Sequence, residues 1–177
     1  LNDCGGLEDL SLYYCDLGGV YSPWLDQTLR EHPSLKSLTL HGCRTEDQFL
    51  AFLQGNDVLT SLSLDQSFDF SNASKATLAQ SIHENRPLKS LDLCDISLDE
   101  ENLRWFQDTL RVNTSLKTLT IDLSDCDHQA TASLISFVQS KECSLESIAV
   151  VSKRTCGTYF PSFLEAARTA SRIKELS

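Results

Sequence analysis

Four side chains in the sequence have the types that could carry out nucleophilic or metal-assisted chemistry: His41, Asp65, Cys94 and Asp122. A cysteine beside a histidine and an aspartate can form a nucleophile, a base and a group that orients the base. The same side chains are also metal ligands. Either use requires the side chains to lie within hydrogen-bonding or coordination distance. The elements that carry these residues therefore decide whether such a site can exist.

Those elements are repeats. The segment Leu7–Leu17 has leucine at its first, fourth, sixth and eleventh positions and cysteine at its ninth, and the pattern returns at Leu35–Cys43 and Leu88–Leu98. This is the L-x-x-L-x-L-x-x-N/C-x-L pattern, so the chain resembles the leucine-rich-repeat family. Repeats begin, at spacings of 28, 24, 29, 28, 29 and 28 residues, at Leu7, Leu35, Leu59, Leu88, Leu116, Leu145 and Ile173.

Repeats of this length leave room for a helix after each strand, and over essentially all 177 residues the chain is similar to the ribonuclease-inhibitor-like class. The resemblance implies an α/β fold, a right-handed, curved solenoid with a parallel sheet on its concave face and helices on its convex face. We expect one domain over residues 1–177, with six repeats of 24–29 residues and a partial seventh. Neither end shows the polar cap that a solenoid needs, so we expect a fragment of a longer protein.

Apolar pairs four residues apart recur before each repeat start and predict the helix faces that pack on the sheet. In the fifth repeat Gln139 interrupts the pattern, and we expect Val138 to turn inward instead. Asn56, Asn85 and Asn113 each lie three residues before a repeat start. Since asparagine tolerates the left-handed conformation, these residues are predicted to end helices. The short second repeat predicts a trimmed loop or a lost helical turn.

Side chains at the third, fifth and seventh repeat positions should point outward from the sheet, because strand residues alternate between its faces. This places an acidic band over the central repeats, with aromatic anchors at one end. The resemblance implies that the concave face binds a partner, and the candidate residues are Tyr13, Tyr14, His41, Asp65, Asp92, Asp95, Asp122 and Asp125. The alternative is an ordinary solvated surface.

Catalysis by this stripe is disfavoured. A thiolate needs nearby positive charge, whereas Cys94 lies between aspartate columns that raise the pKa of a thiol. His41 is two strands from Cys94, roughly 9–10 Å at the usual strand spacing, which is too far for direct proton transfer. No pair of His or Cys residues is placed to bind a metal, and motifs for nucleotide or hydrolase chemistry are missing from the sequence. We expect no enzyme activity, no metal site and no cofactor.

The net charge of −10 argues against nucleic acid, which requires clustered basic residues. The apolar runs are too short to span a bilayer, so no membrane role is expected. Of the seven cysteines, Cys15 and Cys43 occupy the ninth repeat position and the other five are scattered without a disulfide framework, which indicates thiols in a reducing compartment. We therefore expect a cytoplasmic module, in its own cell or in a host cell, that binds a protein partner with a basic or neutral surface. No small-molecule substrate is expected. The alternative is a targeting or regulatory domain of a larger enzyme or effector, such as a ubiquitin-ligase receptor, an innate-immune sensor, a GTPase regulator or a bacterial effector.

Overall fold

The computed structural model describes residues 5–18, 22–45, 49–66, 71–84, 87–97, 100–123, 128–151, 160–170 and 173–176. The chain divides into two compact units, Leu1–Ser90 and Leu91–Ser177. The expectation of a single domain over residues 1–177 stays a prediction.

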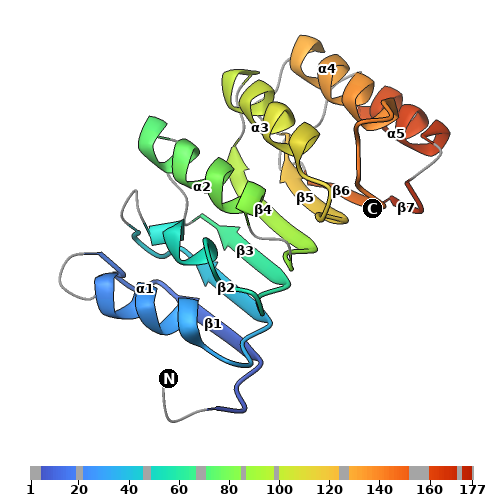
Figure 1. Ribbon diagram of the computed structural model, residues 1–177. Helices are drawn as coiled ribbons and strands as arrows, with labels where there is room; N and C mark the ends of the chain where they lie inside the picture. Colours follow the sequence, from blue (N-terminus) through green and yellow to red (C-terminus); the bar gives the residue numbers. More distant parts are fainter. Residues whose placement is uncertain are drawn as a thin grey trace. The chain divides into compact units, whose positions relative to one another are not determined.

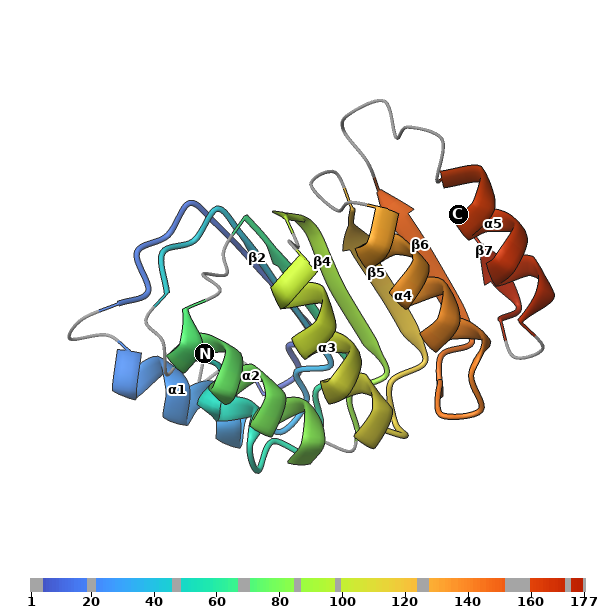
Figure 2. The same ribbon diagram turned by 90° about the horizontal axis from the view of Figure 1, so that it is seen from above.

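The first unit contains three parallel strands in chain order, β1 (Asp9–Tyr13), β2 (Ser37–His41) and β3 (Ser61–Asp65). Leu10, Leu38 and Leu62 are register partners, so each strand is paired with the next at the same repeat position. The helices α1 (Ser22–Glu31) and α2 (Asn72–Glu84) and the 3₁₀ helix η2 (Phe49–Leu53) alternate with the strands. Figures 1 and 2 show that these helices lie on one side of the strands.

The second unit repeats this plan. Its strands are β4 (Ser90–Ser97, beginning at the last residue of the first unit), β5 (Thr118–Asp122), β6 (Ser147–Val151) and the short β7 (Glu175–Leu176). They alternate with α3 (Glu100–Val112), α4 (His128–Gln139) and α5 (Phe160–Thr169). β5, β6 and β7 pair in parallel. The predicted parallel sheet alternating with helices is confirmed.

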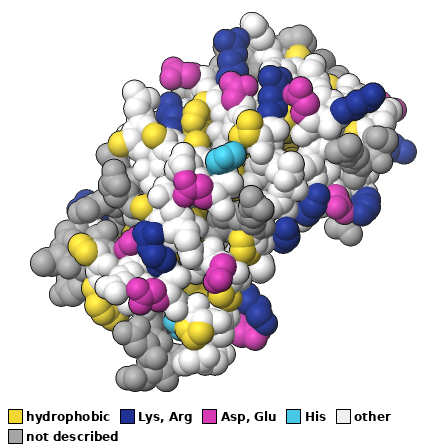
Figure 3. All heavy atoms as spheres, viewed as in Figure 1, with side chains coloured by type: hydrophobic (Ala, Val, Ile, Leu, Met, Phe, Trp, Pro, Cys, Tyr) yellow, Lys and Arg dark blue, Asp and Glu magenta, His cyan; other side chains and the backbone are white. Residues whose placement is uncertain are grey.

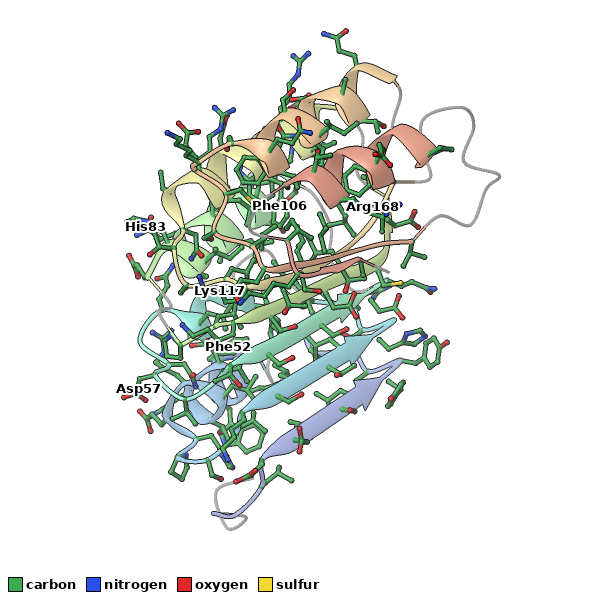
Figure 4. All side chains as sticks on the ribbon, turned by 90° about the vertical axis from the view of Figure 1, so that its right-hand side faces the viewer. Phe52, Asp57, His83, Phe106, Lys117 and Arg168 are labelled. Carbon is green, nitrogen blue, oxygen red and sulfur yellow. The ribbon has the colours of Figure 1, made fainter. Side chains whose placement is uncertain are left out.

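The core of each unit lies between its strands and its helices, because alternate strand residues and one helix face are buried together. Leu38 and Leu40 of β2 are fully buried, while the other three residues of the strand are half-buried. Leu10 and Leu12 of β1 are only half-buried, because β1 is an edge strand and no described strand pairs with its other side. Figure 4 shows Phe52 and Phe106 among the side chains packed between helix and strand.

The short second repeat has a 3₁₀ helix where the first and third repeats have α-helices. Four of the five residues of η2 are buried, so the trimmed repeat still fills its share of the core. Arg30 of α1 donates to the carbonyl oxygens of Gln54, at 2.5 Å, and Ala51, at 3.0 Å. The bond to Gln54 satisfies a carbonyl that a longer helix would have paired internally, whereas the Ala51 carbonyl also accepts the backbone N–H of Gln54 at 3.0 Å. Of the two alternatives expected for this repeat, a trimmed loop or a lost helical turn, the structure shows the shortened helix.

In α4 the buried face is displaced by one residue. Leu134 and Val138 are buried, Ile135 is half-buried and Gln139 is exposed. The buried pair is thus Leu134 and Val138 instead of Ile135 and Gln139. Burial of Gln139 would remove its side-chain amide from water, which costs free energy unless the amide finds other hydrogen-bond partners. The expected inward turn of Val138 is confirmed.

The asparagines before the repeat starts act differently from the expectation. Positive φ among the described non-glycine residues occurs only at Tyr14 and Gln66, so Asn56 and Asn113 are not left-handed. Each accepts, with its side-chain oxygen, backbone N–H groups of the segment that leads into the next strand. Asn56 Oδ1 lies 2.7 Å from Leu59 N, and Asn113 Oδ1 lies 2.8 Å from Leu116 N. They stabilise the turn by side-chain bonding, and the prediction of left-handed helix ends is wrong for these two. Asn85 lies outside the described residues.

Within the described ranges, no helix combines the length and the apolar character needed to cross a bilayer.

Candidate functional site

The strand register of the first unit brings Tyr13, His41 and Asp65 side by side. Tyr13 pairs with His41, and His41 pairs with Asp65, at the last position of each strand. The leucines one residue earlier in each strand face the helices, and Leu40 and Leu64 are buried there. The side chains of Tyr13, His41 and Asp65 therefore emerge on the opposite face. We call this helix-free surface the outer face. The three residues are neighbours in the strand register, and their role as a binding stripe stays a prediction.

Tyr14 joins this group because the chain turns sharply after β1. Its φ is +53°, and the residues at the equivalent position of the next two repeats, Gly42 and Gln66, have φ of +59° and +52°. The first three repeats thus share this left-handed turn, and a tyrosine adopts it at a modest cost in conformational energy. The turn lays the ring of Tyr14 over Gly42, where an added Cβ would meet ring carbons at 2.6 and 2.7 Å.

A chain of hydrogen bonds connects three of these side chains. Tyr14 Oη lies 3.0 Å from His41 Nε2, and His41 Nδ1 is hydrogen-bonded to Asp65 Oδ2. A carboxylate can only accept, so the ring nitrogen that faces it carries the proton. In the neutral imidazole, Nε2 is then the acceptor, and the hydroxyl of Tyr14 donates to it.

The two tyrosines are exposed, whereas the side chains of His41 and Asp65 are half-buried. Tyr14 is 74% and Tyr13 59% exposed, whereas the side chains of His41 and Asp65 are 24% and 22% exposed. The ring centroids of Tyr13 and Tyr14 lie 5.8 and 5.1 Å from that of His41. The two tyrosines therefore shield the imidazole on two sides and present their own rings to solvent. Exposed aromatic side chains beside a fixed polar group are typical of interface anchors.

The acidic residues of the second unit are less accessible than expected. Asp92 is half-buried and accepts a hydrogen bond of 2.9 Å from the backbone N of Cys94. Asp122 is only 4% exposed, which corrects the expectation that it is an exposed band residue. Alternation along a strand decides which face a side chain takes, whereas neighbouring segments decide whether that face is covered. Of the remaining candidates, Asp125 lies outside the described residues, as does the side chain of Asp95.

His41 and Asp65 belong to the first unit, and Cys94 and Asp122 to the second. In the described part of the chain, no three histidine, cysteine or acidic side chains are grouped so that they could hold a metal ion. The described cysteines Cys15, Cys43, Cys94 and Cys143 are thiols and not members of disulfides.

Sequence reasoning missed two features. One is the bond from Tyr14 to His41, which depends on the left-handed turn; the glycine at the equivalent position of the next repeat was the available signal. The other is a ladder of ion pairs at the second repeat position. Lys36 bonds Glu8 at 2.6 Å in the first unit, while in the second Glu146 pairs with Lys117 at 3.7 Å and with Lys174. Alternating charge at one repeat position was its signal. On the side that Figure 3 shows, acidic and basic side chains are likewise interspersed.

The ladder predicts a pH effect at Glu146. Its hydrogen bond to the Lys174 ammonium, followed by the charges of Lys174 and Lys117, holds the pKa of Glu146 below its ordinary value. The carboxylate therefore contributes stability that is present above the ordinary pKa of glutamate and is lost as pH falls through the lowered one. An NMR titration of the side-chain carboxyl should show the lowered midpoint, and Lys174→Ala should return it toward normal. An unchanged midpoint in that variant would contradict the pairing.

Gly42→Ala should break the Tyr14–His41 hydrogen bond. The new methyl group would occupy the place of the Tyr14 ring, and the left-handed backbone adds a cost of about 1–2 kcal/mol. We expect the NMR signals of the His41 imidazole to move and Tyr14 to lose its fixed ring position. Gly55→Ala is the matched control, because its φ is +95° but the nearest atom to its Cβ is Arg30 Nη1 at 3.9 Å. It should lower stability and leave the His41 signals in place. Equal changes at His41 in both variants would contradict the packing of Tyr14 on Gly42.

Comparisons with known proteins support the repeat fold. No family model matches the chain. Coronatine-insensitive protein homolog 2 of Oryza sativa, from subspecies indica and japonica, is 33% identical over 113 residues, which is 62% of this chain. The chain spans only 19% of the length of these curated relatives. Among solved structures, Leiomodin-1 Actin-Binding Site 2 is similar with a TM-score of 0.66 and 14% identity, over 85% of this chain and 89% of that one. These similarities fit a leucine-rich-repeat-like fold.

Proposed function

We propose that this chain is a leucine-rich-repeat module of the ribonuclease-inhibitor-like class that binds a protein partner on its outer face. In this proposal the units continue as a right-handed, curved solenoid whose outer face is concave. The observation that carries it is the exposure of Tyr13 and Tyr14 on a helix-free surface. Large aromatic side chains are costly to leave in water, and they dominate the energetics of protein interfaces.

The proposed partner is a protein with a basic surface. The chain carries a net charge of −10, and Asp9, Asp65 and Asp92 lie at outward positions of their strands. Complementary charge speeds encounter and selects among partners. The same charge disfavours nucleic acid. We further propose that the module acts by binding rather than by catalysis, and that it works in the cytoplasm of its own cell or of a host cell.

A second candidate is a targeting or regulatory domain of a larger enzyme or effector. It is favoured by the match to relatives of which this chain spans 19%. The two candidates differ in what a surrounding polypeptide would do. Under the second, removing residues 1–177 from that polypeptide would redirect or deregulate its activity, and under the first it would only abolish partner capture.

Replacing both Tyr13 and Tyr14 with alanine should weaken partner binding. Loss of an aromatic anchor costs about 2 kcal/mol or more, equivalent to roughly thirtyfold in affinity. The fold should survive, because both rings are largely exposed. The partner would be captured from lysate with the wild-type chain, identified by mass spectrometry and titrated against each variant.

Trp24→Ala is the matched control. Trp24 is also a large exposed aromatic residue, 55% exposed, but it belongs to α1 in the helix layer. It should leave the affinity unchanged. If Trp24→Ala weakens binding and the double tyrosine variant does not, the partner binds the helix side and the outer-face proposal is wrong.

A further inference from the structure

We propose that Tyr14 is a nucleophilic tyrosine: its phenol oxygen accepts an acyl group from a neutral, activated acyl donor, with His41 as general base. This is a modification site in its own right, and it does not depend on the proposed partner binding. Asp65 is the positioning residue that holds the imidazole.

The geometry follows the logic of nucleophile, base and orienting carboxylate. Tyr14 Oη is 3.0 Å from His41 Nε2, and Nδ1 of the same ring bonds Asp65 Oδ2. The carboxylate fixes the tautomer, so the neutral imidazole presents an acceptor to the phenol proton. When Tyr14 attacks, the developing imidazolium is stabilised by the negative charge already at its other side.

The reaction requires an accessible nucleophile and a base shielded from solvent, and the exposure of the three side chains fits this requirement. The nucleophile is the most accessible member, at 74%, while the side chains of His41 and Asp65 are only 24% and 22% exposed. A reagent in solution can therefore reach the phenol oxygen without meeting the base directly. The left-handed turn and the contact with Gly42 hold the ring where its hydroxyl meets Nε2, so the arrangement needs no reorganisation before reaction.

The charge of the surroundings selects the class of donor. Asp65 lies behind the imidazole and the whole chain carries −10, so an anionic phosphoryl donor approaches against repulsion. A neutral acyl donor meets no such penalty. In the step, the bond from Tyr14 Oη to the acyl carbon forms and the bond from that carbon to the leaving group breaks. The phenol proton passes to His41 Nε2 and then to the leaving group or to water.

Tyr13 is the control that the chain itself provides. It neighbours Tyr14, is 59% exposed, and its ring also lies near His41, but its hydroxyl has no described hydrogen bond to the imidazole. The whole chain would be treated with limiting N-acetylimidazole, which produces an acetyl-tyrosine ester and free imidazole. Tandem mass spectrometry would then follow acetylation of each tyrosine over time. We expect Tyr14 to react at least about tenfold faster than Tyr13, toward the low end of general-base effects because the site is exposed.

Two variants and a pH profile separate chemistry from structure. His41→Gln should reduce the Tyr14 rate to that of Tyr13 and leave Tyr13 unchanged. Asp65→Asn should lower the Tyr14 rate and change the shape of its pH profile, since the imidazolium that develops in the step loses its carboxylate. In the wild-type chain the Tyr14 rate should rise with pH and level off once the imidazole is neutral, while the Tyr13 rate follows phenol ionisation and continues to rise.

Equal rates at Tyr13 and Tyr14 in the wild-type chain would overturn the proposal, as would a folded His41→Gln variant with an unchanged Tyr14 rate. If circular dichroism shows that His41→Gln does not fold, the wild-type rate ratio and the plateau in the pH profile decide the question. A Tyr14 rate that rises without a plateau would also overturn it.

Discussion

Replacing Phe52 with alanine is expected to destabilise the first unit by about 3–5 kcal/mol, the usual cost of removing a buried phenylalanine side chain. Phe52 of η2 is fully buried, and the centroid of its ring lies 5.7 Å from that of Phe49. The 3₁₀ helix has only five residues to fill the space that a full helix fills in the repeats beside it. Few neighbours can therefore move into the cavity. Urea denaturation followed by circular dichroism would measure the loss.

Phe52→Leu is the control for this prediction. It keeps most of the apolar volume, so its cost should stay below roughly 1.5 kcal/mol. If Phe52→Ala were no more costly than Phe52→Leu, η2 would not be part of the core as the structure describes it.

Asn56→Ala should destabilise the same unit by roughly 2–5 kcal/mol, because each buried polar group left without a partner costs about 1–3 kcal/mol. The Asn56 side chain is buried and bonds in two directions. Its Nδ2 donates to the Leu29 carbonyl at 2.9 Å, and its Oδ1 accepts from the N–H groups of Val58 at 3.1 Å and Leu59 at 2.7 Å. Removal of the amide leaves backbone groups at the end of α1 and before β3 without this partner. The midpoint of thermal unfolding would report the change.

Asn56→Asp tests the donor separately. The carboxylate can still accept from Val58 and Leu59, but it faces the Leu29 carbonyl with negative charge instead of an N–H group. Burial next to that oxygen favours the protonated form, so this variant should be least stable at neutral pH and recover as pH falls. Stability of Asn56→Asp that does not change with pH would show that the amide donor is not needed.

Asn113→Ala should produce a similar loss in the second unit, since Asn113 Oδ1 accepts from the backbone N–H groups of Ser115 at 3.0 Å and Leu116 at 2.8 Å.

Much of the architecture was predictable because it depends on short periods in the sequence. Leucines at alternate positions mark one strand face, and apolar pairs four residues apart mark one helix face. The shift to Leu134 and Val138 was also predictable, because Gln139 left an obvious gap in the pattern. The outward stripe of Tyr13, His41 and Asp65 followed from the same alternation, once the repeat starts were aligned.

The strand and helix faces, the place of the irregular second repeat and the alignment of residues on the outer face can all be read from the repeat pattern. Which of those residues are accessible, and which are in contact, depends on the folded arrangement of the strands and turns. Asp122 has the right alternation and is nevertheless buried, because coverage depends on segments distant in the chain. Tyr14 meets His41, 27 residues away, because a left-handed turn at Tyr14 places its ring over Gly42, which follows the next strand. Periodicity is a local property of the chain, whereas contact and burial depend on register and turn geometry, and these determine how Tyr14, His41 and Asp65 form one hydrogen-bonded group.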